Sequence, residues 1–275
     1  MKSSFHLQQN TTPDRLKSIL NAAVDKCVNS AEIAAECNLK LSVLNKLVLP
    51  FIHHLGLIQN NSLSLTDLGI QFYELSKKST ALFSESVHHL LYTAHRFDMS
   101  KCFSWAYARI VNILWGSKEV LLDSRTTAQL VGIIVEEAER TFSIPVERIA
   151  FSAHSIRGAL NWLRALEPPV VNKRGKEDYF NLRYYCSPQS FLWAVDFLYR
   201  TNDISYGVRM FLTPERIEQL CKQCLLDPSG LDNVLIITKR TSDYDRGGIF
   251  DYGLEGGFGQ WILLTHPSAV PTMIE

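Results

Sequence analysis

The sequence lacks any imbalance of charge. Its 275 residues include 28 lysines and arginines against 28 aspartates and glutamates, so the formal net charge is zero. A protein that coats nucleic acid through bulk positive charge is therefore excluded, and any contact with nucleic acid has to come from a local basic patch. Apolar residues are not scarce: they make up 46% of the chain, which excludes an intrinsically disordered protein.

Long hydrophobic runs are also missing. No apolar run approaches the ~18 residues of a membrane-spanning helix. The first ten residues lack the apolar stretch of a secretory signal. The six cysteines are scattered through the chain, as is typical of reduced and mostly buried thiols. We therefore predict a cytoplasmic protein with no membrane partner.

Motifs of metal and cofactor chemistry are scarce. Cys221 and Cys224 form the only C-x-x-C, they lie late in a predicted helix, and no second Cys or His pair lies at zinc-finger spacing. His88, His89 and His95 belong to no H-E-x-x-H pattern, and neither a P-loop nor a dinucleotide-binding glycine pattern occurs. The sequence predicts no cofactor and no bound metal, and it favours a non-enzymatic role.

We predict a mainly α protein with short β-hairpins. Two winged-helix-like modules are joined by a helical bundle and followed by a small mixed α/β part. The predicted segments are a winged helix-turn-helix at 1–78, a helical middle at 79–142, a second winged-helix-like module at 143–186 and a C-terminal α/β segment at 187–275.

The prediction of the first module depends on the order of its predicted helices and strands. Helices predicted from the apolar period cover 13–27, 31–37 and 42–55. Asn29 and Ser42 are the predicted N-caps of the second and third helices. Asn60 and Asn61 supply the turn of a hairpin that follows. Helix, helix, turn, helix and hairpin is the order of a winged helix-turn-helix.

The third predicted helix offers polar side chains of the kind that read DNA. Such side chains contact base edges and phosphates, and the candidates are Lys40, Ser42, Asn45 and Lys46. Over 1–78, eight basic residues against six acidic ones give a net charge of only +2, which is weak for non-specific DNA binding. A winged helix used for protein contacts is therefore an equal alternative.

The second module carries a basic hairpin tip. A short helix is predicted over 145–150 and a longer one over 156–166, followed by a hairpin between 170–171 and 179–182. Over 151–185, six basic residues oppose three acidic ones. A basic wing tip can enter a minor groove or clamp phosphates, and a solvated loop is the alternative. The DNA-binding candidates are Arg157, Arg164, Lys173, Arg174 and Lys176.

The remaining segments carry weaker signals. Aromatic residues between 103 and 115 recur at helical spacing and predict a packing surface. A long helix is predicted over about 127–142, and a buried strand is predicted over 234–238. The acidic residues of the loop that follows suit a divalent ion by type, but their spacing matches no EF-hand; they are Asp243, Asp245, Asp251 and Glu255.

Several short motifs are spread along the chain: Phe5-His6, Gly56-Leu57-Ile58, Leu65-Thr66-x-Leu68-Gly69, the aromatic helix Trp105–Trp115, Phe250-Asp251-Tyr252 and Gln260-Trp261. In these motifs the chain resembles an uncharacterised bacterial domain family. Members of that family are encoded beside phosphoadenosine-phosphosulfate-reductase-like and ATPase genes in DNA-modification and phage-defence islands. The resemblance implies antiviral defence or DNA modification as the setting, and supplies no catalytic residues.

Three functions follow as hypotheses. The first is a non-enzymatic DNA-binding or adaptor subunit of a DNA-modification or phage-defence complex, with double-stranded DNA and other defence or modification proteins as partners. The second is a protein–protein interaction module that docks on an ATPase or modification enzyme without touching DNA. The third is a metal-dependent hydrolase that uses the late acidic loop, and no nucleophile–base pair supports it.

Overall fold

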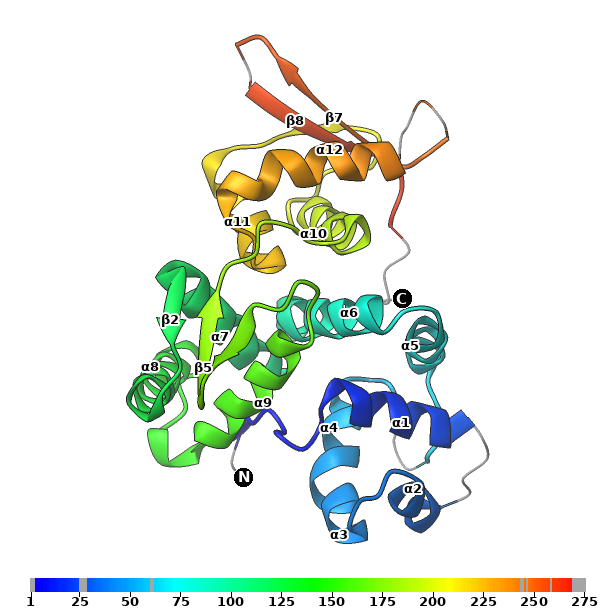
Figure 1. Ribbon diagram of the computed structural model, residues 1–275, viewed down its shortest axis with the longest axis vertical. Helices are drawn as coiled ribbons and strands as arrows, with labels where there is room; N and C mark the ends of the chain where they lie inside the picture. The colour runs from blue at the N-terminus through cyan, green and yellow to red at the C-terminus, as the bar shows by residue number, and fades with distance from the viewer. Residues whose placement is uncertain are drawn as a thin grey trace.

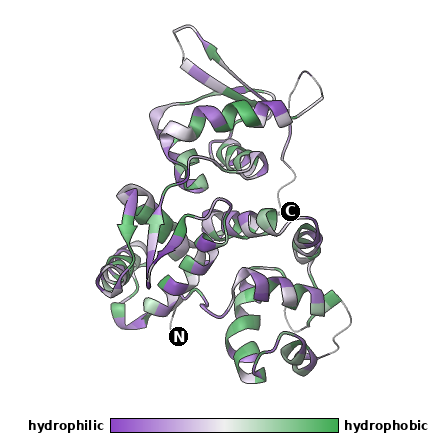
Figure 2. Ribbon diagram, viewed as in Figure 1, coloured by the Kyte–Doolittle hydropathy of each residue, from purple (hydrophilic) through white to green (hydrophobic). Residues whose placement is uncertain are grey.

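The computed structural model describes residues 3–24, 29–59, 62–242, 245, 247–257 and 259–268. The protein is mainly helical, as predicted, and carries two small three-stranded antiparallel sheets. The hydrophobic and hydrophilic residues alternate along many of its helices (Figure 2), as expected of helices that bury one side. Within the described ranges, no helix is long and apolar enough to cross a membrane.

Three groups of elements follow one another along the chain (Figure 1). The first comprises α1 (Pro13–Val24), α2 (Ser30–Glu36) and a continuous helical stretch of α3 (Leu41–Val43), a π-helical turn (Leu44–Val48) and α4 (Leu49–His54). The predicted hairpin is reduced to a single β-bridge between Ile58 and Leu65, and its predicted turn at Asn60 and Asn61 lies outside the described residues.

The Leu65-Thr66-x-Leu68-Gly69 motif joins this bridge to α5 (Asp67–Lys78). The Thr66 hydroxyl donates to the Gly56 carbonyl at 2.5 Å and accepts from the Gly69 N–H at 3.0 Å, so Thr66 is the N-cap of α5. A Cβ atom at position 69 would lie 2.0 Å from the Leu57 carbonyl oxygen. Only glycine allows the helix to approach the chain after α4 this closely.

Helix α6 (Thr80–Thr93) and the 3₁₀ turn η2 (Ala94–Arg96) lead into the second group. This group consists of α7 (Cys102–Ser117), β2 (Glu119–Leu121), α8 (Ser124–Phe142), η3 (Val146–Arg148), β3 (Ile149–Ala150), α9 (Ala153–Arg164), β4 (Val171–Arg174) and β5 (Glu177–Asn181). The sheet has the order β2-β5-β4, so the predicted hairpin is confirmed and gains a third strand.

Strand β2 lies within the segment 79–142, which was predicted as a helical middle, and was not expected from the sequence. It has only three residues, which is too short for an alternating pattern to reveal, and its pairing with β5 joins residues about 60 positions apart. The helix predicted over 145–150 is also wrong: a 3₁₀ turn is followed by β3 there, because Pro145 precedes the turn and residues 149–150 pair with β1 (Ser3–Ser4). Helix α8 begins at Ser124 rather than 127, since the Asp123 carboxylate caps it.

The third group repeats the element order of the second. It consists of α10 (Pro188–Thr201), β6 (Arg209–Phe211), α11 (Pro214–Cys224), η4 (Pro228–Gly230), α12 (Leu231–Thr241), β7 (Phe250–Glu255) and β8 (Gly259–Leu264). The sheet order β6-β8-β7 matches β2-β5-β4: in each sheet the first strand pairs with the last, which lies in the middle. Helix, strand, helix, helix, hairpin therefore occurs twice.

The buried strand predicted over 234–238 is wrong, because these residues form the middle of α12. Val234, Leu235 and Thr238 are buried while Ile236 is 37% exposed, which is the period of a helix with one buried face. The β-branched run suggested a strand by composition. Packing of α12 against α10 and β7 overrides that preference.

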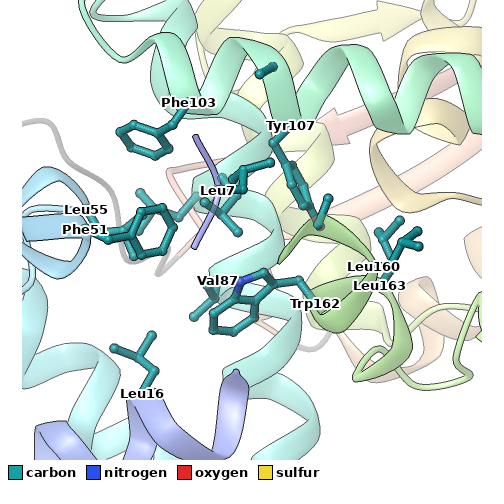
Figure 3. Close-up of a cluster of buried hydrophobic side chains, with 14 of the residues drawn as sticks. Leu7, Leu16, Phe51, Leu55, Val87, Phe103, Tyr107, Leu160, Trp162 and Leu163 are labelled. Carbon is teal, nitrogen blue, oxygen red and sulfur yellow. The ribbon is translucent and has the colours of Figure 1, made fainter. Parts of the chain in front are cut away.

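The N-terminal segment joins the first two groups. Phe5 and Leu7 are fully buried, and Phe5 makes edge-on contacts with Trp105 and Phe142. Leu7 lies among side chains from both groups and from α6 in Figure 3, including Phe51, Val87 and Phe103. Groups one and two therefore share one hydrophobic core, whereas a second core lies within the third group.

Candidate nucleic-acid interface

The four polar candidates of the first group are all exposed. Lys40, Ser42, Asn45 and Lys46 lie at the start of the helical stretch 41–54, whose other side is buried in the core. The turn that precedes them contains Asn38 with φ of 50°, a left-handed conformation that asparagine tolerates well. The Asn29 side chain accepts from the Ala31 and Glu32 N–H groups, which confirms it as the cap of α2.

Ser42 is not an N-cap, contrary to prediction. The helix begins at Leu41, and the residue in the N-cap position is Lys40, whose side chain has no acceptor and makes no capping bond. The helix therefore begins without a side-chain cap, and the Val43 and Leu44 N–H groups both bond to the Lys40 carbonyl, at 2.9 and 3.0 Å.

Asn45 and Lys46 lie in a π-helical turn, which the sequence analysis did not anticipate. The Leu49 N–H bonds to the Leu44 carbonyl, five residues back instead of four. Pro50 explains the wider turn, because a proline ring clashes with the carbonyl four residues earlier and offers no N–H to it. The turn sets the direction in which these two polar side chains point, and π-turns of this kind are frequent at functional sites.

The β4–β5 hairpin of the second group presents the predicted basic tip to solvent. Lys173, Arg174 and Lys176 are all exposed, and Gly175 makes the tight turn with φ of 64°. The side chains of Lys173 and Lys176 have no hydrogen-bond or ion-pair partner within the described part of the chain. These two ammonium groups are therefore available to an external anion.

Acidic residues of the same sheet lie close to this basic tip and reduce its net positive charge. Lys173 lies opposite Asp178 and Arg174 opposite Glu177 across the two strands. The Arg174 guanidinium lies 3.9 Å from the centre of the Tyr179 ring and 3.9 Å from Glu119. Ion pairs this exposed contribute little energy, so they do not prevent Arg174 from turning toward a phosphate.

The other two candidates of this group are placed less favourably. Arg164 is half-buried and bonded to Asp178 at 2.8 Å, so it supports the hairpin from α9. Arg157 is exposed on α9. Much of the surrounding helix surface is covered by the N-terminal segment, because Gln9 contacts His154 and Asn161 and a Cβ atom at Gly158 would lie 2.5 Å from the Leu7 carbonyl oxygen. In the second group the β4–β5 hairpin is therefore more accessible to an external ligand than α9 is.

The sequence analysis missed a buried polar cluster where α6 meets the second and third groups. The Glu85 carboxylate accepts two bonds from the Arg183 guanidinium, at 2.5 and 3.0 Å, and both side chains are almost fully buried. Arg183 also donates to the Cys224 carbonyl at 2.7 Å. Burial by itself raises the pKa of Glu85. The charge and hydrogen bonds of Arg183, together with smaller contributions from neighbouring groups, outweigh burial and hold this pKa below its usual range.

Two histidines extend the cluster. His88 donates from Nε2 to the Gln223 carbonyl at 2.8 Å, because a carbonyl oxygen only accepts, and its Nδ1 lies 2.7 Å from the Tyr107 hydroxyl, which donates to it when the ring is neutral. The Gln223 side-chain amide donates to His89 at 2.7 Å. Burial lowers the pKa of His88 to about 4 and that of His89 to about 3. The cavity beside them has a volume of about 10 Å³, room for one water molecule and not for a substrate.

These histidines predict a loss of stability in mild acid. Their pKa values are lower in the folded protein than the usual 6.5, so the unfolded chain binds protons first as the pH falls. Their contribution to stability is complete above pH ~6.5 and declines toward pH ~4, by up to about 1.4 kcal/mol per pH unit for each ring. Urea unfolding at pH 7.5, 6.0 and 5.0 measures this slope.

A His88→Gln/His89→Gln double variant provides the control for this slope. It should be less stable at pH 7.5 and should show a flatter dependence of unfolding free energy on pH than the parent protein between pH 6.5 and 5.0. An unchanged slope would contradict the assignment of neutral buried rings.

Two carboxylates of the late acidic loop are paired with cations. Asp251 pairs with Lys239 at 2.5 Å and Glu255 with Arg209 at 3.2 Å, while Asp243 lies outside the described residues. The described ranges contain no group of three or more His, Cys, Asp or Glu residues placed to hold a metal ion. Cys221 and Cys224 lie on α11, as predicted. Burial raises the pKa of the Cys221 thiol to about 12, and a hydrogen bond with Cys186, together with burial, raises the pKa of the Cys224 thiol.

No protein-family model, no curated protein and no solved structure matches this chain.

Proposed function

We propose that this protein is a non-enzymatic subunit that binds double-stranded DNA and acts as an adaptor to other proteins. The observation that carries the proposal is the exposure of two polar surfaces on separate groups: the start of the helical stretch 41–54, and the β4–β5 hairpin tip. Both offer cationic groups to solvent, and both follow the helix order in which DNA-binding proteins place a reading helix and a wing.

The repeated topology supports the winged-helix part of this proposal. Helix, strand, helix, helix, hairpin, with the last strand in the middle of the sheet, is the arrangement of a winged helix. We propose three such units, at 13–66, 102–182 and 188–264, of which the first has the least developed wing. The second unit then begins inside the segment predicted as a helical middle, and the third replaces the undivided C-terminal α/β segment.

The distribution of charge along the chain supports different partners for the first two units and for the third. Residues 1–186 carry 21 basic and 17 acidic residues, whereas residues 187–275 carry 7 and 11. A polyanion is attracted to the first part and repelled by the second. We therefore propose that the first two units contact DNA and that the third faces a protein partner, such as a component of a DNA-modification or phage-defence complex.

Replacing Lys173 and Lys176 by alanine is expected to weaken DNA binding about tenfold at 100 mM salt. If both ammonium groups contact phosphates, the slope of log affinity against log salt should also fall by about 1.8, because each lost contact removes about 0.9. Fluorescence anisotropy with a labelled duplex between 50 and 200 mM salt measures both quantities. A Lys40→Ala/Lys46→Ala variant tests the first unit in the same way.

An Arg140→Ala/Arg148→Ala variant is the matched control, because it removes two exposed charges from α8 and η3. It should leave both the affinity and the slope nearly unchanged. If the parent protein fails to bind duplex DNA at 50 mM salt, or if the control weakens binding as much as the test variant, the DNA-binding proposal fails. The interaction module without DNA contact then becomes the better account.

A further inference from the structure

A groove of about 560 Å³ lies between the second and third groups, away from the surfaces discussed above. One wall is formed by η2 and the loop after it, a second by α7, and the third by the end of α10. The lining includes Arg96, Phe97, Met99, Arg109, Asn112 and Arg200. The volume falls in the range of pockets that hold small organic ligands, roughly 300–1,000 Å³.

Three guanidinium groups and no carboxylate line this groove. Arg96 is exposed and has no hydrogen-bond or ion-pair partner among the residues that the structure describes. Arg200 lies 5.1 Å above the Phe97 ring and 4.0 Å from the Asp196 carboxylate, which is a loose pairing. Arg109 is held rigidly by two bonds to Glu137, at 2.6 and 2.7 Å. The groove therefore favours an anion.

The other polar groups add hydrogen-bond capacity without adding negative charge. Burial lowers the pKa of His95 to about 4, so this ring is neutral at pH 7. The Asn112 carbonyl oxygen accepts from the Tyr92 hydroxyl at 2.9 Å, which identifies that atom as the oxygen and leaves the NH₂ group as a donor. The nearby Asp98 carboxylate accepts from the Ser100 N–H and does not line the groove.

Apolar surface accompanies the positive charge. Phe97 is 42% exposed and Met99 is 53% exposed, although most large apolar side chains of this protein are buried. An inorganic anion would leave this surface and most of the volume unfilled. A planar aromatic group on the same ligand would cover Phe97 and Met99, as bases do on aromatic side chains.

We propose that this groove binds a mononucleotide, with its phosphate held by Arg96 and Arg200 and its base placed against Phe97 and Met99. Planar guanidinium groups bind phosphate oxygens with two parallel hydrogen bonds, which explains the use of arginine. Arg96 follows α6 and Arg200 belongs to α10. A bound phosphate would therefore link the third group to the rest of the protein. This proposal is independent of DNA binding by the first two groups.

Isothermal titration of the 275-residue protein with AMP, GMP, CMP and UMP tests the proposal. At least one of them should bind saturably, and its affinity should fall about tenfold or more in each of Arg96→Ala and Arg200→Ala, because each loses a charge-assisted bond. The matching nucleoside and inorganic phosphate should each bind at least about tenfold more weakly than the nucleotide. Arg240→Ala, which removes an exposed arginine from α12, should bind as the parent does.

Thermal unfolding in the absence of ligand checks that the variants remain folded. A Phe97→Ser variant separately tests the contact between the base and Phe97. This variant should bind the nucleotide more weakly than the parent does, while its affinity for inorganic phosphate should be unchanged. Absence of saturable nucleotide binding at 1 mM would overturn the proposal, as would equal binding of inorganic phosphate and nucleotide. Loss of duplex DNA binding in Arg96→Ala and Arg200→Ala without any nucleotide binding would assign the groove to the DNA surface instead.

Discussion

Replacing Glu85 by leucine is expected to lower the free energy of unfolding by about 3–5 kcal/mol. The substitution leaves the Arg183 guanidinium buried without its carboxylate partner, and the low polarity of the surroundings makes an unpaired charge costly. Arg183 lies between α6 and α11, so the effect should reach both hydrophobic cores. Urea denaturation followed by circular dichroism measures the loss.

A Glu85→Leu/Arg183→Met double variant should be less destabilised than the sum of the two single variants, because it removes both charges together. Glu136→Leu is the surface control. Glu136 pairs with Arg140 on α8 with both side chains about two-thirds exposed, so its loss should change stability by less than about 0.5 kcal/mol. A loss below about 1 kcal/mol for Glu85→Leu would show that the buried pair does not hold the groups together.

Replacing Gly69 by alanine should destabilise the protein by about 1–3 kcal/mol. Alanine normally strengthens a helix by up to about 1 kcal/mol relative to glycine, so the sign of this effect is informative. The added Cβ would lie 2.0 Å from the Leu57 carbonyl oxygen, and this neighbour is backbone that cannot turn away. The helix α5 would have to move off the chain that follows α4. Thermal or urea unfolding measures the change.

Gly132→Ala provides the opposite case within the same protein. Gly132 lies inside α8, and a Cβ atom there would have no heavy atom within 4 Å. This variant should be stabilised by up to about 1 kcal/mol. If Gly69→Ala were equally stabilising, the close approach of α5 to Leu57 would not exist in solution.

Much of the helical structure could be predicted because its signals are local. Asn29 caps α2, and the apolar period placed α1 and α9 within a few residues of their observed bounds. The predicted basic hairpin tip is the turn between β4 and β5. Each of these signals acts between residues only a few positions apart, so the residues that carry it appear together in the sequence.

Other features had no local signal. The run Val234–Thr238 has the composition of a strand, but α10 and β7 offer it a surface that only a helix with one buried side can fill. Strand β2 exists because β5 pairs with it. The exposed positions of Lys173 and Lys176 were predicted, whereas the coverage of α9 by the N-terminal segment was not, because Gln9 and Asn161 are 152 positions apart.

The amino-acid sequence by itself determined where helices begin, which of their sides are apolar, and where a basic turn protrudes, since capping, periodicity and turn formation are interactions between near neighbours. Only the tertiary structure decided that Glu85 meets Arg183 and that Arg96 and Arg200 line one groove, because these pairs are 98 and 104 positions apart in the sequence. Charges so distant are brought together by the packing of whole helices, and nothing in the residues on either side of them specifies the partner.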